Sequence, residues 1–346
     1  MPLYLGVLIL SFILTLVSCI PFIDFLYKNR FVRKKETEEK RTNETKEFKL
    51  IRAKHAHKAG TPTGLGLLLL VLIPLLFGAL FPVLVPHPSS NLFSNFPIRM
   101  ELIAIFTTFF GFGLIGLYDD LVKVFGFSVT LHFGLRRRHK FALQCLVALI
   151  TSGQLYWGLG INFLHIPMLG TLYLGWLYLP LTALLIATFA NAFDITSGLD
   201  GLGEGLLIIC LFAFLLIAYT RLDHISLLFI AIWLGTLIGT TYFTIHPARA
   251  FLGNASGLAF GSTLAVIGLI SGKIFPLLIV GGIFMLEIGS SLLQIIGKNV
   301  FKKRVFPIAP LHHWLELIGW EEPKIVIRGW LVGLVLAIFG LCLAFL

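Results

Sequence analysis

Long apolar segments, separated by short polar connections, run along the whole chain. Most of them hold about 20 residues, which is enough for an α-helix to cross roughly 30 Å of hydrocarbon. The pattern predicts an all-α polytopic membrane protein with about ten transmembrane helices. The predicted spans are Leu3–Phe25, Gly64–Val85, Met100–Leu117, Phe141–Phe163, Leu169–Ala190, Leu202–Tyr219, Ile225–Ile245, Gly257–Ser271, Phe275–Ile296 and Ile325–Leu346.

The composition agrees with this pattern. Of the 346 residues, 57% are hydrophobic and only 13% are charged, and the mean hydropathy is +0.93. A soluble domain cannot bury that much apolar surface, so we predict one integral-membrane domain over residues 1–346. The first apolar run is too long for a signal peptide and lacks a small-residue cleavage site, so we expect it to remain as a helix.

Basic residues lie almost wholly on one side of the predicted membrane. All of the 27 lysines and arginines except Arg99, Arg221 and Lys273 fall in or beside the connections that follow odd-numbered spans. By the positive-inside rule these connections face the cytoplasm, and both termini face the periplasm or outside. The net charge of +10 is typical of topogenesis and contact with anionic membrane lipids. No aromatic-basic motif indicates a nucleic-acid partner.

The unusual polar residues collect in the same cytoplasmic connections. Residues 28–63 form a charged loop, and residues 298–324 form a loop that contains the pair His312-His313. Between these loops come the segments GLYDDLVK, NAFDITSGLDGLGEG and HPARAFLGNASG. A pore or proton pathway would place ionisable groups at mid-bilayer, where only Glu287 is a clear candidate. The distribution therefore predicts an active site in the cytoplasmic loops.

Asp119 and Asp120 are the leading candidates for chemistry. Carboxylates beside glycine-rich loops and lysines suit a Mg²⁺-bound polyphosphate, because Mg²⁺ prefers carboxylate and phosphate oxygens. From the residues alone, an ordinary i, i+4 ion pair between Asp119 and Lys123 fits equally well. We reject a zinc site at His312-His313, because adjacent histidines diverge and no Cys or third His lies at ligand spacing.

Four sequence blocks occur in a specific order: KAGTPTGLG at 58–66, LYDDLVK at 117–123, NAFDITSGLDGL at 191–202 and PLHHWLELIGWEEPKIVIR at 310–328. Together they resemble the phospho-N-acetylmuramoyl-pentapeptide transferases, which belong to the polyprenyl-phosphate N-acetylhexosamine-1-phosphate transferase superfamily of glycosyltransferase 4 type. The resemblance covers nearly the whole chain. EIGSSLLQ, which begins at Glu287, looks like the family's ninth helix, so Glu287 is expected to belong to the fold rather than to a proton relay.

The resemblance implies a reaction of bacterial cell-wall synthesis at the inner (plasma) membrane. Undecaprenyl phosphate attacks the β-phosphorus of UDP-MurNAc-pentapeptide, giving lipid I and UMP, with Mg²⁺ required; a homodimer is a further expectation. The implied catalytic residues are Asp119, Asp120, Lys123, His312 and His313, and the implied metal ligands are Asp119, Asp120 and Asn254. The implied substrate-binding residues are Lys58, Asn191, Ile195, Ser197, Gly198, Asp200, Phe251 and Gln294.

The chain departs from the family pattern at several of these positions. The family's NLTDGLDG reads DITSGLDG here, so Asp194 replaces an Asn and Ser197 replaces an Asp. The family's FMGDTGS reads FLGNASG, which puts Asn254 where a metal-binding Asp is expected. An amide oxygen can ligate Mg²⁺ but brings no charge, and Asp194 could restore that charge if it reaches the metal. Thr244 and Trp314 also stand where the family has Asn and a third histidine.

Three interpretations stay open. The first is an active muramoyl-pentapeptide phosphotransferase with a rearranged metal site. The second is a sister phosphotransferase with another donor, such as UDP-GlcNAc, and Ser197, Thr244 and Trp314 motivate it. The third is a catalytically weak paralogue that binds nucleotide-sugar or lipid without turnover, and Asn254 is its main support. We carry the first forward.

Overall fold

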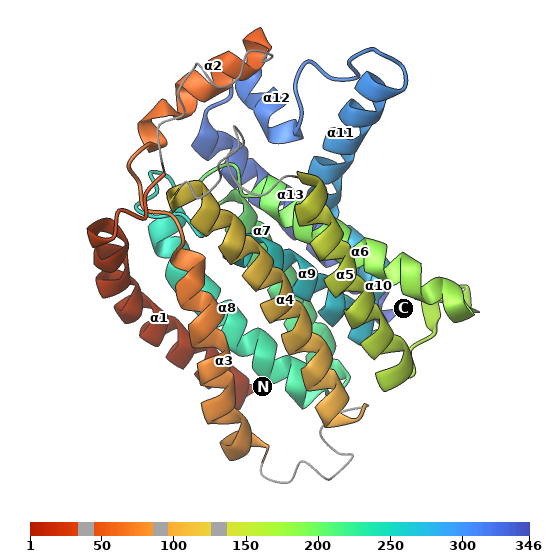
Figure 1. Ribbon diagram of the computed structural model, residues 1–346. Coiled ribbons are helices and arrows are strands. Elements are labelled where there is room, and N and C mark those ends of the chain that lie inside the picture. Colours follow the sequence, from red (N-terminus) through yellow and green to blue (C-terminus); the bar gives the residue numbers. More distant parts are fainter. Residues whose placement is uncertain (34–44, 86–95, 126–136) are drawn as a thin grey trace.

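The computed structural model describes residues 1–33, 45–85, 96–125 and 137–346, and these ranges are mostly helical (Figure 1). Part of the charged loop predicted at 28–63 lies outside the described residues. The long helices are α1 (Pro2–Lys28), α3 (Leu65–Leu84), α4 (Ile98–Phe125), α5 (Arg137–Gly153), α6 (Tyr178–Thr196), α7 (Leu202–Thr220), α8 (His224–Thr244), α9 (Asn254–Ile270), α11 (Gly282–Asn299) and α13 (Glu322–Phe345). The shorter ones are α2 (Lys46–Lys54), η2 (His55–Lys58), η3 (Gln154–Gly158), η4 (Gly175–Leu177), α10 (Ile274–Val280) and α12 (Leu311–Leu317).

Helices α8 and α9 form the centre of the bundle, with α1, α4 and α6 packed against them (Figure 1). One aromatic contact joins α8 to α9, because the ring of Trp233 lies against that of Phe260 and also against that of Phe229. The outer helices α1, α3 and α13 expose many leucine, isoleucine and valine side chains. In a bilayer these side chains face lipid, so close helix packing depends on shape and on small residues rather than on hydrophobicity.

The structure has several helices of membrane-spanning length, as the hydropathy pattern predicts. Within the described residues, seven helices are long and apolar enough to cross a membrane, and the pair α10–α11, bent by 78°, makes an eighth if it counts as one span. The other two predicted spans fall on α5 and α9, which have 17 residues each. The prediction of a helical, multi-span protein is confirmed. The side of the membrane that each terminus faces stays a prediction.

One part of the predicted span pattern is wrong. Strands β1 (Phe163–Ile166) and β2 (Gly170–Tyr173) form an antiparallel hairpin between α5 and α6. The predicted fourth span therefore ends too late, at Phe163, and the predicted fifth span begins too early, at Leu169. Because the hairpin is mostly apolar, its turn is not recognised from the hydropathy pattern. Gly170, with φ of +95°, takes a left-handed conformation where the chain leaves the turn and β2 begins.

The polar motifs lie at helix ends rather than in separate loops. Asp119 and Asp120 belong to the last turns of α4, and Asn191 and Asp194 belong to the end of α6. Asn254 opens α9. Helices α2 and α12 lie side by side at one end of the bundle (Figure 1). The functional motifs are therefore held on rigid elements.

Candidate active site

A cavity of about 410 Å³ opens where the polar ends of α4, α6, α7 and α9 meet. It has the size of an ordinary small-molecule site. Predicted site residues line it from elements that are far apart in the sequence. They are Asp120, Lys123, Ser197, Gly198, Asp200, Phe251 and Asn254.

Asp119 lies beside this cavity and gathers three nitrogen groups. Its Oδ2 lies 2.9 Å from Lys123 Nζ and 3.2 Å from Lys140 Nζ, and it also accepts a hydrogen bond from the side-chain amide of Asn254. The ammonium of Lys140 reaches Asp194 Oδ2 as well, at 3.3 Å. Lys140 therefore bridges two carboxylates from α4 and α6. The i, i+4 pair with Lys123 exists, but it is one part of a larger charge cluster.

Asp120 is buried and fixed by the start of α9. Its Oδ2 accepts the backbone N–H of Ala255 at 3.0 Å, a favourable arrangement because helix N-termini attract negative charge. Two glycines allow this approach. A Cβ on Gly116 would lie 2.1 Å from the Asn254 carbonyl oxygen, and a Cβ on Gly253 would lie 2.7 Å from Asp120 Oδ2. The close packing of α4 on α9 therefore sets the position of both aspartates.

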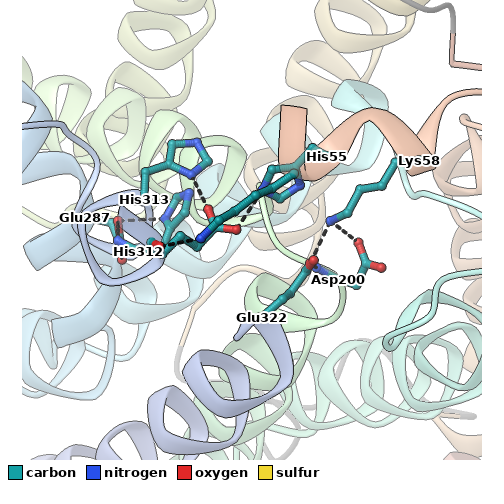
Figure 2. A network of polar contacts seen from close by, with 9 residues as sticks. His55, Lys58, Asp200, Glu287, His312, His313 and Glu322 are labelled. Atoms are coloured by element: carbon teal, nitrogen blue, oxygen red, sulfur yellow. Dashed lines mark hydrogen bonds and ion pairs between the residues drawn. The ribbon is translucent and has the colours of Figure 1, made fainter. Parts of the chain in front are cut away.

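A second charge cluster surrounds Lys58 (Figure 2). The Lys58 ammonium donates to Asp200 Oδ1 and to Glu322 Oε1, both at 2.6 Å, and all three side chains are buried. Glu322 Oε1 also accepts the backbone N–H of Asp200 at 2.6 Å. Asp200 Oδ2 accepts the backbone N–H of Ala248 at 3.1 Å. The 197–201 turn is thus tied to α13 and to the segment before α3.

The ionisation of Asp200 follows from this cluster. Burial acts to raise its pKa, but the Lys58 ammonium and the hydrogen bonds from Lys58 and Ala248 outweigh burial, so the pKa lies below the ordinary 3.8. Asp200 is therefore ionised at neutral pH. Its negative charge is balanced by the Lys58 ammonium, and the ionised carboxylate cannot serve as a general acid.

The two adjacent histidines take different partners (Figure 2). His312 Nδ1 lies 2.9 Å from Glu287 Oε2, and its backbone N–H donates to the same carboxylate, so Glu287 supports the fold as expected from the resemblance. His313 Nδ1 lies 2.8 Å from Glu316 Oε2. The other oxygen of Glu316 lies 2.8 Å from His55 Nε2.

Among the described residues, two groups of three side chains, each brought together from distant parts of the sequence, have the spacing of metal ligands. The ligand atoms of His55, His313 and Glu316 lie within 4.8 Å of one another, as do those of Asp200, His246 and Glu322. Sequence spacing does not reveal the first of these groups, because His55 lies 258 positions before His313. In both groups the same atoms already pair through hydrogen bonds or ion pairs, which explains these residues without a metal.

Glu316 connects the α2–η2 segment to α12. Burial acts to raise its pKa, but hydrogen bonds from His313 and His55 lower it from 4.5 to about 2. Burial lowers the pKa of His313. A carboxylate with a depressed folded pKa stabilises the fold above its unfolded pKa, so this contribution is complete above about pH 4.5 and lost as the pH falls toward 2. The contact with α12 is thus at full strength at neutral pH.

We expect Glu316→Gln to loosen the α2–η2 segment at pH 7.5, because the charge that holds His55 and His313 is removed. Limited proteolysis should cut between residues 46 and 58 several times faster than in the unmodified protein. Glu47→Gln is the matched control, since it removes a carboxylate on the same segment whose pair with Arg304 is exposed and contributes little. Equal cleavage rates for the two variants would contradict the assignment.

Besides Lys58, three predicted substrate-binding residues do not line the cavity. Asn191 donates to Gln144 Oε1 at 2.8 Å and to Ala187 O at 2.7 Å, which joins α6 to α5. Gln294 binds the backbone of Val305 and Phe306, so it shapes the loop before α12. Neither these two residues nor Ile195 lines the cavity. Their roles toward substrate stay predictions.

Lys140 and Glu322 are central to the two clusters but were not assigned from the sequence. Lys140 was visible only as the last member of a basic run, and Glu322 only as one letter of the WEEPK segment. A charged residue at the polar end of a predicted span was the available signal. Sequence spacing does not reveal that Lys140 lies between Asp119 and Asp194 or that Glu322 meets Lys58.

The donor chemistry at the Asp119 cluster fits Mg²⁺. Asp119, Asp120 and Asp194 supply hard carboxylate oxygens, and Asn254 adds an amide, which is the ligand type that Mg²⁺ prefers. The two lysines that already bind these carboxylates show that the place is built for positive charge. Asp194 lines the cavity with Asp120 and Asn254, so a third carboxylate is present although residue 254 is not one.

Comparison with known proteins gives a consistent result. Residues 102–272 match the family model described as glycosyl transferase family 4. The chain is 33% identical over 341 residues to the phospho-N-acetylmuramoyl-pentapeptide-transferase of Halalkalibacterium halodurans, covering 97% of this chain and 96% of the relative. It is 34% identical over 344 residues to the protein of the same name from Shouchella clausii, with 97% and 96% covered. For the one from Bacillus subtilis the identity is 31% over 288 residues, with 83% and 85% covered.

Proposed function

This chain belongs to glycosyl transferase family 4, among the phospho-N-acetylmuramoyl-pentapeptide transferases, and from that premise we propose that it makes lipid I from UDP-MurNAc-pentapeptide and undecaprenyl phosphate. It is a multi-pass phosphotransferase of a bacterial membrane. The family fixes nucleotide-sugar and lipid phosphate as the classes of substrate. The identity of the sugar, the peptide and the lipid is part of the proposal.

One observation carries the proposal. Asp119, Asp194, Lys123 and Lys140 from α4, α5 and α6 form one charge cluster. Lys123 and Asp194 of this cluster, together with Asp120, line a cavity that the 197–201 turn and Phe251 also line. Phosphoryl transfer between anions depends mainly on positioning and on neutralising charge. A cluster with both signs of charge beside a nucleotide-sized cavity suits that task.

The proposed reaction makes one bond and breaks one bond. An oxygen of the lipid phosphate bonds to the β-phosphorus of the donor, and the bond from that phosphorus to the bridging oxygen breaks. UMP leaves with the bridging oxygen, and the sugar keeps its phosphate. The acceptor is already an oxyanion, so no proton has to be removed before attack.

The lysines offset the repulsion between the two anionic substrates. Lys123 is partly exposed and can turn to a phosphate, whereas Lys140 holds Asp119 and Asp194 in place. Asp120 is held rigidly by the Ala255 N–H, so its orientation is fixed before substrate binds. Mg²⁺, bound by Asp119, Asp120, Asp194 or Asn254, would supply Lewis-acid neutralisation of phosphate charge.

His312 suits a role toward the sugar phosphate. Its Nδ1 is fixed by Glu287, and its buried Nε2 has no hydrogen-bond partner in the described part of the chain. A Cβ on Gly198 would lie 2.9 Å from that Nε2, and Gly198 lines the cavity. Glycine at 198 therefore lets the imidazole edge of His312 pack directly against the 197–201 turn, one residue from the cavity wall.

UMP release tests the proposal. Purified protein in detergent is given undecaprenyl phosphate, Mg²⁺ and either UDP-MurNAc-pentapeptide or UDP-GlcNAc. We expect UMP with the muramoyl donor and none after addition of EDTA. Absence of UMP with both donors, while the protein still binds UDP-sugar, would overturn the enzyme assignment and leave the binding paralogue.

A sister enzyme is the second candidate, and Ser197 favours it. Ser197 lines the cavity where the family pattern has an Asp, and its hydroxyl donates to Phe193 O at 2.9 Å rather than into the site. A site that has lost a carboxylate there suits a different donor sugar. UMP release with UDP-GlcNAc alone would select this function.

Replacing the Asn254 amide should raise Mg²⁺ affinity and lower thermal stability in the absence of Mg²⁺. Asn254→Asp replaces the amide that donates to Asp119 with a second carboxylate. Mg²⁺ affinity should rise on the order of tenfold because a charged ligand is added. Without divalent cation the variant should be less thermally stable, because two carboxylates then repel. Mg²⁺ titration of activity and thermal unfolding in EDTA measure the two effects.

Asn162→Asp is the matched control, since it makes the same chemical change near the hairpin formed by β1 and β2. It should leave Mg²⁺ affinity unchanged. If Asn254→Asp also leaves both quantities unchanged, residue 254 lies outside the metal site.

A further inference from the structure

Glu204 is a cavity residue that the proposed reaction does not use. It lies in the first turn of α7, is 5% exposed, and lines the cavity beside Asp200 and Ser197. Its Oε2 atom has no hydrogen-bond partner within the described residues. A buried carboxylate oxygen without a partner is costly to desolvate, so such atoms in folded proteins call for a ligand.

The other three acids on the cavity wall are already engaged. Asp120 accepts the Ala255 N–H, and Asp194 pairs with Lys140. Asp200 has both oxygens occupied, and Figure 2 shows its carboxylate turned to Lys58. Among the described acids that line this cavity, Glu204 is thus the one with a fully buried oxygen that has no hydrogen-bond partner.

Thr244, next to Glu204, also has a buried polar atom at the cavity wall. It ends α8, is 1% exposed, and lines the same cavity. Its hydroxyl lies close enough to the Glu204 carboxyl to interact with it, but its Oγ1 makes no hydrogen bond of good geometry within the described residues. A hydroxyl can donate and accept, whereas an ionised carboxylate only accepts. Together they form an acceptor with a donor next to it.

This pair does not suit a phosphate. A carboxylate repels phosphate oxygens, and the cationic side chains that line the cavity, Arg33 and Lys123, come from other elements. A pair of this kind matches a flat ligand edge that has an N–H beside a carbonyl oxygen or ring nitrogen. Nucleobase edges have that pattern, and carboxylates and hydroxyls are among the groups that bind them.

We propose that Glu204 and Thr244 bind the base of the donor nucleotide, with Glu204 accepting the ring N–H and Thr244 donating to the neighbouring acceptor. The inference rests on the proposed function, because it takes the cavity ligand to be a uridine nucleotide. Glu204 is then a specificity-determining residue in α7, separate from the carboxylates that handle phosphate. Phe251 lines the same cavity and offers an aromatic face to the base.

The test compares UMP with 3-methyl-UMP, in which the N3–H is replaced by a methyl group. Binding is measured by isothermal titration calorimetry on the purified full-length protein in detergent. In the unmodified protein, methylation should weaken binding at least about tenfold, since a buried acceptor loses its donor. In Glu204→Ala the loss on methylation should shrink to less than about threefold, because the acceptor is gone.

Thr244→Val provides a second variant in case Glu204→Ala does not fold. It should weaken UMP binding several-fold. Thr263→Val is its matched control, because Thr263 is also buried and without a partner among the described residues but lies outside the cavity. It should bind UMP as the unmodified protein does.

Two results would overturn the inference, and only the second would also overturn the proposed function. In the first, methylation of UMP weakens binding as much in Glu204→Ala as in the unmodified protein, and Thr244→Val binds UMP normally. Glu204 and Thr244 then have no part in base recognition, and the proposed function still stands if UMP is released in the enzyme assay. Absence of both UMP binding and UMP release in the unmodified protein would remove the proposed function and the inference with it.

Discussion

Asp120→Asn should lower turnover on the order of 10⁴-fold, the size of effect seen when the aspartate of a catalytic triad is replaced by asparagine. The side chain keeps its shape, and its amide oxygen can still accept the Ala255 N–H. The loss is therefore one of charge beside the reacting phosphates, not of fold. UMP release and UMP affinity measure the two aspects separately, and affinity should change by less than tenfold.

Asp223→Asn is the matched control for this substitution. Asp223 is also buried and also accepts a backbone N–H, from Ser226 at 3.1 Å, but it caps the start of α8. Asn is as good a cap as Asp, so stability and turnover should stay close to those of the unmodified protein. Turnover of Asp120→Asn within tenfold of the unmodified protein would remove Asp120 from the chemistry.

Lys58→Met should reduce the free energy of unfolding by about 3–5 kcal/mol, the cost of breaking a buried ion pair by removing one partner. The substitution leaves Asp200 and Glu322 facing each other without the ammonium that lies 2.6 Å from each. The 197–201 turn should loosen as a result. Nucleotide binding should fall together with stability, because that turn lines the cavity.

Lys123→Met makes the same chemical change in a different environment. The Lys123 side chain is 41% exposed, whereas that of Lys58 is 2% exposed, so its pair with Asp119 should contribute only about 0–1 kcal/mol to stability. Denaturant titrations of the two variants in detergent measure the difference. Equal losses would contradict the view that burial makes Lys58 a structural centre of the site.

Hydropathy predicted most of the fold because the bilayer imposes one local rule. A helix that crosses hydrocarbon needs a long apolar run, and that rule located α1, α3, α4, α7, α8 and α13. The rule fails where an apolar segment stays outside a helix. The hairpin from Phe163 to Tyr173 is such a case, since its side chains are as apolar as those of a span.

The site was predictable in its motifs but not in its partnerships. The resemblance located Asp120 and the 197–201 turn, which line the cavity, and Asp119, which lies beside it. It did not reveal Lys140, Glu322 or Glu204, whose roles depend on contacts across tens to hundreds of residues. Local spacing carries no information about such contacts, so the sequence predicts a set of site residues and not their arrangement.

Asn254 is a residue whose surroundings could not be predicted from the sequence. From the sequence it was a missing carboxylate at the metal site. In the structure its amide donates to Asp119, while Lys140 ties that same aspartate to Asp194. The carboxylate absent at 254 is thus balanced by one at 194, which shares the cavity wall with Asp120. A working cation site without an acid at position 254 is consistent with this geometry.

Transfer of the β-phosphorus is the most direct measure of the central claim. The purified protein is incubated with undecaprenyl phosphate, Mg²⁺ and UDP-MurNAc-pentapeptide that carries ³²P at the β-phosphorus, and lipid and water-soluble fractions are separated. The label should move to the lipid fraction, with Mg²⁺ required and with transfer slowed on the order of 10⁴-fold in Asp120→Asn. Label that stays in the water-soluble fraction with the unmodified protein would contradict the account.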